Sequence, residues 1–191
     1  MEITAWIANA VFVTGISWRL LLGVIGAEAD YNVRAEHWGY RTADAIVALN
    51  AGDDAALRSI IASEWPDISF GPGQRIIPYH YYGDQSRTLA NILAVRSFVF
   101  ANPERDILEM SRWLVAKRAT ILAADRDLNR VNYDLDLATA ISYNRGSYPY
   151  DGSRYWVAYS ANVARFQDAL AEFDVKARQL AEDALRQPYS D

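Results

Sequence analysis

The residue in this sequence best suited to acid–base chemistry is Glu28. It stands near the C-terminal end of an apolar stretch whose periodicity predicts a buried helix over residues 17 to 29. Burial and the negative end of the helix dipole both disfavour a charged carboxylate, so we expect the pKa of Glu28 to be raised. A carboxylic acid that stays protonated near neutral pH can protonate a glycosidic oxygen. Glu28 is therefore a candidate general acid, although a solvated helix end is the commoner explanation of its position alone.

Few other residues offer metal-binding or nucleophilic chemistry. The sequence has no cysteine, which excludes disulfides, thiolate metal sites and a cysteine nucleophile. The two histidines, His37 and His80, lie too far apart for a local zinc motif, so we expect ordinary surface or loop histidines, no metal and no cofactor. The formal net charge of −5 gives no general attraction to nucleic acid, which we do not expect as a partner.

The elements that position Glu28 are predicted to be helices. The 191 residues are 51% hydrophobic and 23% charged, enough for one substantial core, and we expect a single mainly α domain over 1–191 with little or no β-sheet. Thr42 and Asp53 are predicted to cap two amphipathic helices, and Asp84 or Ser86 a later one. Apolar periodicity predicts helices near residues 6–14, 17–29, 43–49, 54–65, 86–100, 103–114, 135–143, 154–172 and 175–185.

Two segments interrupt or precede this helical pattern. Residues 66 to 84 contain several glycines and prolines and are predicted to form an extended or looped segment. The uncharged residues 3 to 18 have the length of a signal-peptide core, but no basic residue precedes them and polar residues interrupt them. We therefore expect neither a signal peptide nor a membrane span.

Several short motifs follow Glu28 in the order found in one known family. Residues 28–35, Glu-Ala-Asp-Tyr-Asn-Val-Arg-Ala, resemble the Glu-Ser-x-Phe-Asn-Pro-x-Ala signature of the lytic transglycosylase domain. Residues 69–74, Ser-Phe-Gly-Pro-Gly-Gln, resemble its Ser-x-Gly-x-x-Gln turn. Further on, residues 102–107 resemble its Asp-Pro-x-x-Asn-Ile helix start, residues 140–146 its Ala-x-x-x-Tyr-Asn-x-Gly motif, and residues 159–166 its last helix. Each motif is weak by itself, but several such motifs in the right order are far less expected by chance than any one of them.

By this resemblance, the chain is identified as a member of the lysozyme-like superfamily, which includes lytic transglycosylases and goose-type lysozymes. The similarity spans about residues 16 to 167 and implies a helical domain with a loop-rich cleft for peptidoglycan glycan strands. It implies that Glu28 is the catalytic acid/base and that Ser69 forms a hydrogen bond near it. Gln74 would fix a sugar substituent or the loop, Tyr143 would hold the Glu28 carboxyl through its hydroxyl, and Asn144 would contact the N-acetyl region or cap its helix.

The sequence also departs from the family pattern. Ala29 replaces the usual serine, Val33 a proline, and Asp106 an asparagine, and none of these changes removes the acid. The interval between Glu28 and Ser69 is long for the family, and residues 36–66 are predicted to be a helical insertion. Such an insertion would line the cleft or contact a partner protein.

Two reaction types use the same acid. In a lytic transglycosylase one Glu acts as acid and then base, and the muramic acid's own hydroxyl closes an anhydro ring, so no second carboxylate is needed. An inverting lysozyme, or muramidase, needs a second carboxylate that positions water. Asp67, just before the Ser69 turn, is the candidate and Asp84 a poorer one, although both are also typical loop or cap residues. The transglycosylase is thus the expected function and the muramidase its alternative.

A function of another class also fits the resemblance. A structural protein of a phage tail or virion would keep the lysozyme-like fold with little activity and would bind other virion proteins. The expected lack of an export signal motivates this alternative, since bacteriophages encode such wall-cleaving proteins. We expect a protein in the virion or in the host cytoplasm before release, acting in the cell wall or periplasm. A bacterial effector delivered by a secretion machine is the other origin.

Overall fold

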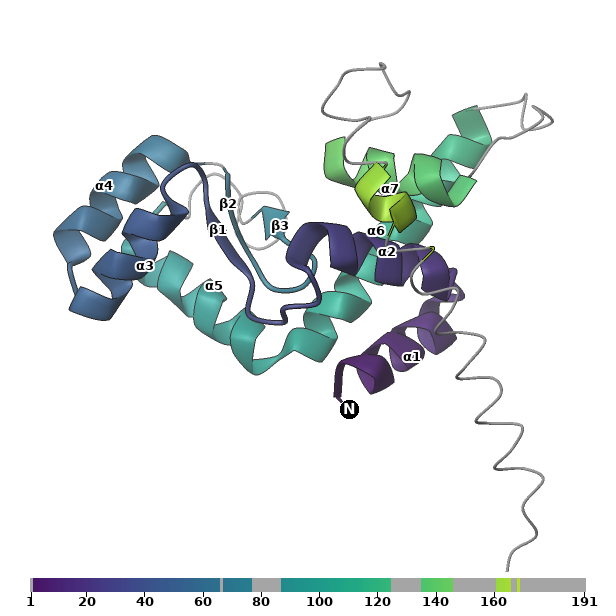
Figure 1. The fold of residues 1–191 in the computed structure, drawn as a ribbon, viewed down its shortest axis with the longest axis horizontal. Coiled ribbons are helices and arrows are strands. Elements are labelled where there is room, and N and C mark those ends of the chain that lie inside the picture. Colours follow the sequence, from purple (N-terminus) through teal and green to yellow (C-terminus); the bar gives the residue numbers. More distant parts are fainter. Residues whose placement is uncertain are drawn as a thin grey trace, which may run out of the picture. The chain divides into compact units, whose positions relative to one another are not determined.

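The computed structural model describes residues 2–65, 67–76, 87–124, 135–145, 161–165 and 168. This part of the chain is mainly α-helical, as the sequence predicts, with one small sheet (Figure 1). The predicted helices at 154–172 and 175–185 lie almost wholly outside the described residues. In chain order the elements are α1 (Glu2–Thr14), α2 (Trp18–Ala29), β1 (Glu36–Trp38), α3 (Thr42–Ala51), α4 (Asp54–Glu64), β2 (Ile68–Phe70), β3 (Arg75–Ile76), α5 (Leu89–Ala101), α6 (Pro103–Ala124) and α7 (Leu135–Arg145).

The helix boundaries confirm one predicted cap and correct two others. The Asp53 carboxylate accepts the Ala56 N–H at 2.9 Å and caps α4 as predicted. Thr42 does not cap α3, because its hydroxyl accepts the Trp38 N–H at 2.9 Å and donates to the Gly39 carbonyl at 3.0 Å. The residue before α5 is Thr88, whose hydroxyl accepts the Asn91 N–H, so neither Asp84 nor Ser86 is its cap.

The small sheet is a feature that the helical periodicity did not predict. Strand β2 lies between β1 and β3, and both pairings are antiparallel. Two of these strands lie inside the segment 66–84, which we predicted to be extended or looped, and β1 lies at the start of 36–66. Each strand has only two or three residues, too few to show the alternation that identifies strands in a sequence.

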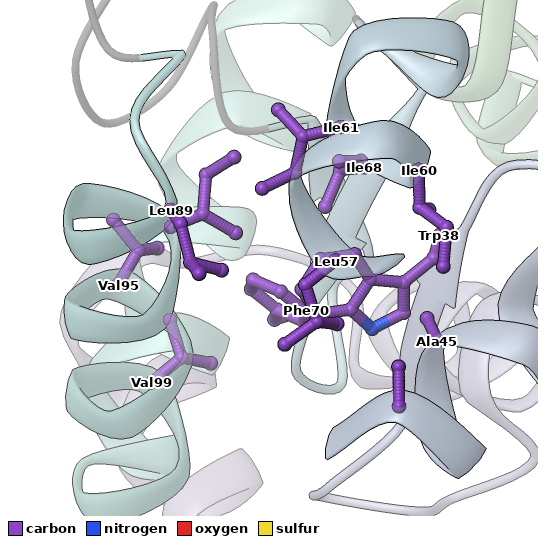
Figure 2. Close-up of a cluster of buried hydrophobic side chains, with 12 residues drawn as sticks. Trp38, Ala45, Leu57, Ile60, Ile61, Ile68, Phe70, Leu89, Val95 and Val99 are labelled. Carbon is purple, nitrogen blue, oxygen red and sulfur yellow. The ribbon is translucent and has the colours of Figure 1, made fainter. Parts of the chain in front are cut away.

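One hydrophobic core joins this sheet to α3, α4 and α5. Trp38 on β1 and Ile68 and Phe70 on β2 are fully buried, and Figure 2 shows them with side chains of all three helices. The rings of Trp38 and Phe70 meet edge to face with centroids 5.4 Å apart. The cluster comprises Trp38, Ala45, Ala48, Leu57, Ile60, Ile61, Ile68, Phe70, Leu89, Ile92, Val95 and Val99.

A salt bridge beside this core connects strand β1 to helix α5. The Arg96 guanidinium donates to both oxygens of the Glu36 carboxylate, at 2.7 Å and 3.0 Å, and the Trp38 indole N–H donates to the same carboxylate at 3.1 Å. Arg96 also lies 4.7 Å above the ring of Phe100, which meets Phe70 edge to face. These contacts fix strand β1 to helix α5 while satisfying the only polar atom of the buried Trp38 side chain.

The chain divides into two compact units. The first contains residues 1–14 and 28–112, and the second residues 15–27 and 113–191, so the division falls within α2 and within α6. The single lysozyme-like domain over 1–191 and the insertion at 36–66 stay predictions. The latter region does contain the two predicted helices, α3 and α4, but its first strand pairs with β2, which lies outside it.

Within the second unit, α6 and α7 are connected by a salt bridge between Arg118 and Asp136 at 2.8 Å. Leu114 on α6 is fully buried, whereas its neighbour Trp113 is 39% exposed. Consecutive helix residues differ by about 100° in direction, so one of two neighbours at the edge of the buried stripe can face the core while the other faces outward. No helix among the described residues combines the length and hydropathy needed to cross a bilayer.

Candidate active site

Glu28 is the last residue but one of α2 and is partly exposed. The chain turns immediately after it: the Asn32 N–H donates to the Ala29 carbonyl at 2.8 Å, and Asp30 and Tyr31 both have left-handed backbone, with φ of 47° and 60°. Left-handed conformation costs non-glycine residues about 1–2 kcal/mol each. Such strain persists where the surrounding structure enforces it, and it concentrates at functional sites.

The loop over residues 29–35 is held by its own polar groups. The Asn32 side-chain oxygen accepts the Arg34 N–H at 3.0 Å, and the Asn32 carbonyl accepts the Ala35 N–H at 3.0 Å. Burial, with a smaller contribution from the charge of Asp30, raises the pKa of Tyr31 to about 12. The Tyr31 hydroxyl therefore stays protonated across the physiological range.

The turn over residues 69–74 brings two of the predicted site residues together. The Ser69 hydroxyl donates to the Gln74 side-chain oxygen at 3.0 Å, and the Gln74 amide donates to the Gly71 carbonyl at 2.8 Å. The backbone is left-handed at Gly71 (φ 82°) and at Gln74 (φ 44°). Of the two roles expected for Gln74, fixing the loop is the one visible in these contacts. Ser69 itself is buried, with 4% of its surface exposed.

A buried carboxylate that is hydrogen-bonded to this turn was not among the predicted site residues. Asp106, on α6, is 2% exposed, and its Oδ2 accepts the Gly73 N–H at 3.1 Å. The sequence did contain a signal, because Asp106 and Ile107 share the buried stripe of α6 with Met110. A carboxylate in such a stripe requires hydrogen-bond donors, and here the turn provides at least one of them.

The loop after Glu28 and the 69–74 turn are directly connected. The Gly71 N–H donates to the Ala35 carbonyl at 2.8 Å, at the point where the loop enters β1 and β2 enters the turn. All of these residues belong to the first unit. The candidate acid is therefore followed in sequence by a loop that is bonded to the turn carrying Ser69 and Gln74.

The remaining predicted residues lie elsewhere. Asp67 is exposed directly before β2, and its N–H donates to the Glu64 carbonyl at 2.7 Å. Tyr143 and Asn144 are partly exposed on the last turn of α7, in the second unit, and their action on Glu28 or on a sugar stays a prediction. His80 and Asp84 lie outside the described residues, as do the helices predicted toward the C-terminus.

No group of three or more metal-ligating side chains is found in the described part of the chain. In comparisons with known proteins, the chain matches no family model, no curated protein and no solved structure.

Proposed function

We propose that this protein cleaves the glycan strands of peptidoglycan as a lytic transglycosylase, with Glu28 as its acid and base. The observation that carries the proposal is the arrangement around Glu28. A carboxylic acid at the end of an apolar helix is followed by a left-handed turn at Asp30 and Tyr31, and the loop is bonded through Ala35 to the Ser69–Gln74 turn. The resemblance of the sequence motifs to those of lytic transglycosylases assigns these same segments to a sugar-cleaving site.

The proposed reaction needs one carboxyl group. Glu28, protonated, donates its proton to the glycosidic oxygen as the bond from the muramic acid anomeric carbon breaks. The resulting carboxylate then removes the proton from the C6 hydroxyl of the same muramic acid, whose oxygen bonds to the anomeric carbon. This closes the 1,6-anhydro ring and restores protonated Glu28, so atoms and protons balance without water. Tyr143 would orient the carboxyl, and Asn144 would contact the N-acetyl region.

The first experiment removes the proton donor. Glu28→Gln keeps the shape of the side chain and should lower the rate of cleavage of purified peptidoglycan by about 10²–10⁴-fold, the usual contribution of a general acid. Glu104→Gln is the matched control, because Glu104 is exposed in the first turn of α6, and it should leave the rate unchanged. Retention of more than about a tenth of the wild-type rate by Glu28→Gln would refute the assignment of the acid.

The product decides between this reaction and hydrolysis. A transglycosylase leaves 1,6-anhydromuramic ends, whereas a muramidase leaves reducing ends that are heavier by one water, and mass spectrometry of the digest separates the two. If reducing ends dominate, an inverting muramidase requires a second carboxylate, and Asp67→Asn should then be as inactive as Glu28→Gln. Complete inactivity of the folded wild-type protein would favour the structural virion protein instead.

A further inference from the structure

The two faces of the β1–β2 pair carry different kinds of side chain. Successive strand residues point to opposite faces, so Trp38, Ile68 and Phe70, which are paired or alternate in the register, all point into the core. His37 is directly opposite Ser69 in the same register, so both side chains lie on the other face. The Cβ atoms of such a pair lie about 4.5–5.5 Å apart. His37 therefore stands beside the serine that the motif resemblance assigns to the sugar site.

Hydrogen-bonding capacity on this face is only partly used within the described residues. His37 is exposed and its imidazole makes no hydrogen bond to any described residue. The Gln74 side chain uses one N–H for the Gly71 carbonyl and one lone pair for Ser69, which leaves one N–H and one lone pair without a partner among the described residues. A neutral imidazole likewise offers one donor and one acceptor. Such groups complement a neutral ligand that carries both donors and acceptors.

We propose that His37 is a substrate-binding residue that hydrogen-bonds an N-acetylated sugar of the glycan beside Ser69 and Gln74. The inference rests on the proposed function, since that function supplies the ligand class. Acetamido and hydroxyl groups are neutral, and each glycan residue offers donors and acceptors together. The strand that carries His37 begins where the loop from Glu28 ends, next to the Ala35–Gly71 hydrogen bond. A glycan contacting His37 therefore lies against the strand that leads directly from the candidate acid.

The chain has only two histidines, which makes His37 a spectroscopic probe of binding. The full-length Glu28→Gln protein, which cannot turn over, is titrated with a hexamer of N-acetylglucosamine and, separately, with a hexamer of glucose. The imidazole resonances of His37 are assigned by their loss in His37→Gln. We expect them to shift and saturate with the N-acetylated hexamer and to stay unchanged with the glucose hexamer.

Affinity and kinetics give the second readout. In the Glu28→Gln background, His37→Ala should weaken binding of the N-acetylated hexamer about tenfold, as expected for the loss of one or two hydrogen bonds. With Glu28 intact, His37→Ala should raise KM for solubilised glycan strands by a similar factor and leave kcat nearly unchanged. Arg58→Ala, an exposed residue on α4 outside the site, is the control and should change neither value.

The other possible outcomes distinguish the binding role of His37 from the proposed catalytic function. If wild-type protein cleaves peptidoglycan but the His37 resonances and the His37→Ala affinity do not change, the binding role of His37 is wrong and the proposed function stands. The same holds if His37→Ala lowers kcat with KM unchanged. If the hexamer shifts His37 but wild-type protein cleaves no glycan, the catalytic proposal fails and the binding site remains. Failure of the hexamer to bind at all would overturn the assignment of His37.

Discussion

The two faces of the small sheet differ in what they do for the protein. The core face consists of fully buried rings and aliphatic chains, packed on α3, α4 and α5 and closed by the Glu36–Arg96 salt bridge. The opposite face carries His37 and Ser69 and continues into a turn with left-handed backbone at Gly71. One face is apolar and regular, and the other is polar and partly strained, with no hydrogen bond from His37 to any described residue.

This difference indicates how the fold would support the proposed site. Left-handed residues such as Asp30, Tyr31 and Gln74 lower the stability of the segments that contain them. They are kept only because the neighbouring core is stable enough to enforce them. Substitutions on the core face should therefore change the free energy of unfolding, and those on the polar face should change activity. The predictions below test this division, beginning with the largest effect.

Removal of the ring of Phe70 should have the largest effect on stability. Phe70 is fully buried between Trp38 and Phe100, and truncation of a buried aromatic residue costs about 3–5 kcal/mol. We expect Phe70→Ala to lower the free energy of unfolding by that amount in urea denaturation. The variant that remains folded at low temperature should keep Glu28-dependent activity. A loss below about 1 kcal/mol would mean that this cluster is not the main core of the unit.

Adding a methyl group at Gly71 should lower the free energy of unfolding less than the loss of the Phe70 ring does. It should lower it more than adding a methyl group at Gly52. Both glycines are left-handed, with φ of 82° and 66°. A Cβ at Gly52 would contact nothing within 4 Å, whereas one at Gly71 would lie 2.7 Å from Asp106 Oδ2 and still closer to Val99. Gly52→Ala should thus cost about 1 kcal/mol from backbone conformation alone.

Gly71→Ala adds overpacking of about 1–3 kcal/mol to the same conformational cost. Because it displaces the turn that carries Ser69 and Gln74, it should also lower activity, which Gly52→Ala should not. Equal unfolding free energies for the two variants, measured side by side in urea, would show that the 69–74 turn is not held against α5 and α6 as described.

The Glu36–Arg96 salt bridge should make stability depend on pH. Burial raises the pKa of Glu36, but the hydrogen bonds from Arg96 and Trp38 and the charge of Arg96 outweigh it, and the pKa lies below its ordinary value of 4.5. A lowered pKa in the folded state contributes stability above the ordinary value, and that contribution is lost as pH falls through the folded-state value. Glu36→Gln should therefore cost about 1–2 kcal/mol at pH 7, with a smaller difference from wild type at pH 3.

Thermal unfolding of wild type and Glu36→Gln across pH 3 to 7 measures this difference. Asp44→Asn is the matched control, since Asp44 forms an exposed salt bridge with Arg41 and should show little pH-dependent difference. A constant gap between wild type and Glu36→Gln over this range would mean that the charge of Glu36 contributes nothing to the core face.

The helices among the described residues were predictable from the sequence because their signals are local. The apolar residues of α2 are close to one another in the sequence, and Asp53 is only three residues before Ala56, whose N–H it accepts. The sheet was not predictable in this way, because β1 pairs with residues thirty or more positions later and its strands are very short. The cap predicted at Thr42 failed for a related reason: its hydroxyl serves the strand before the helix, at Trp38 and Gly39.

The candidate site was predictable in part. Resemblance to a family singled out Ser69 and Gln74, and their mutual hydrogen bond is consistent with one functional turn. Asp106 was seen only as a departure from the family pattern, because its partner Gly73 is distant in sequence. His37 was treated as an ordinary surface residue, since only the strand register places it opposite Ser69. Contacts of this kind require the pairing of distant segments, which periodicity does not reveal.

The smallest expected change in stability belongs to the polar face. Ser69→Ala removes the hydrogen bond to Gln74 and should cost about 1 kcal/mol or less of unfolding free energy, while turnover falls about tenfold if Ser69 and Gln74 orient substrate or acid. Ser63→Ala is the matched control: the Ser63 hydroxyl donates to the Ile60 carbonyl on α4, and its loss should have a similar cost in stability with no change in turnover. Equal turnover in the two variants would remove Ser69 from the site. A large loss of stability in Ser69→Ala would instead show that the polar face supports the fold as much as the core face does, and the division between the two faces would fail.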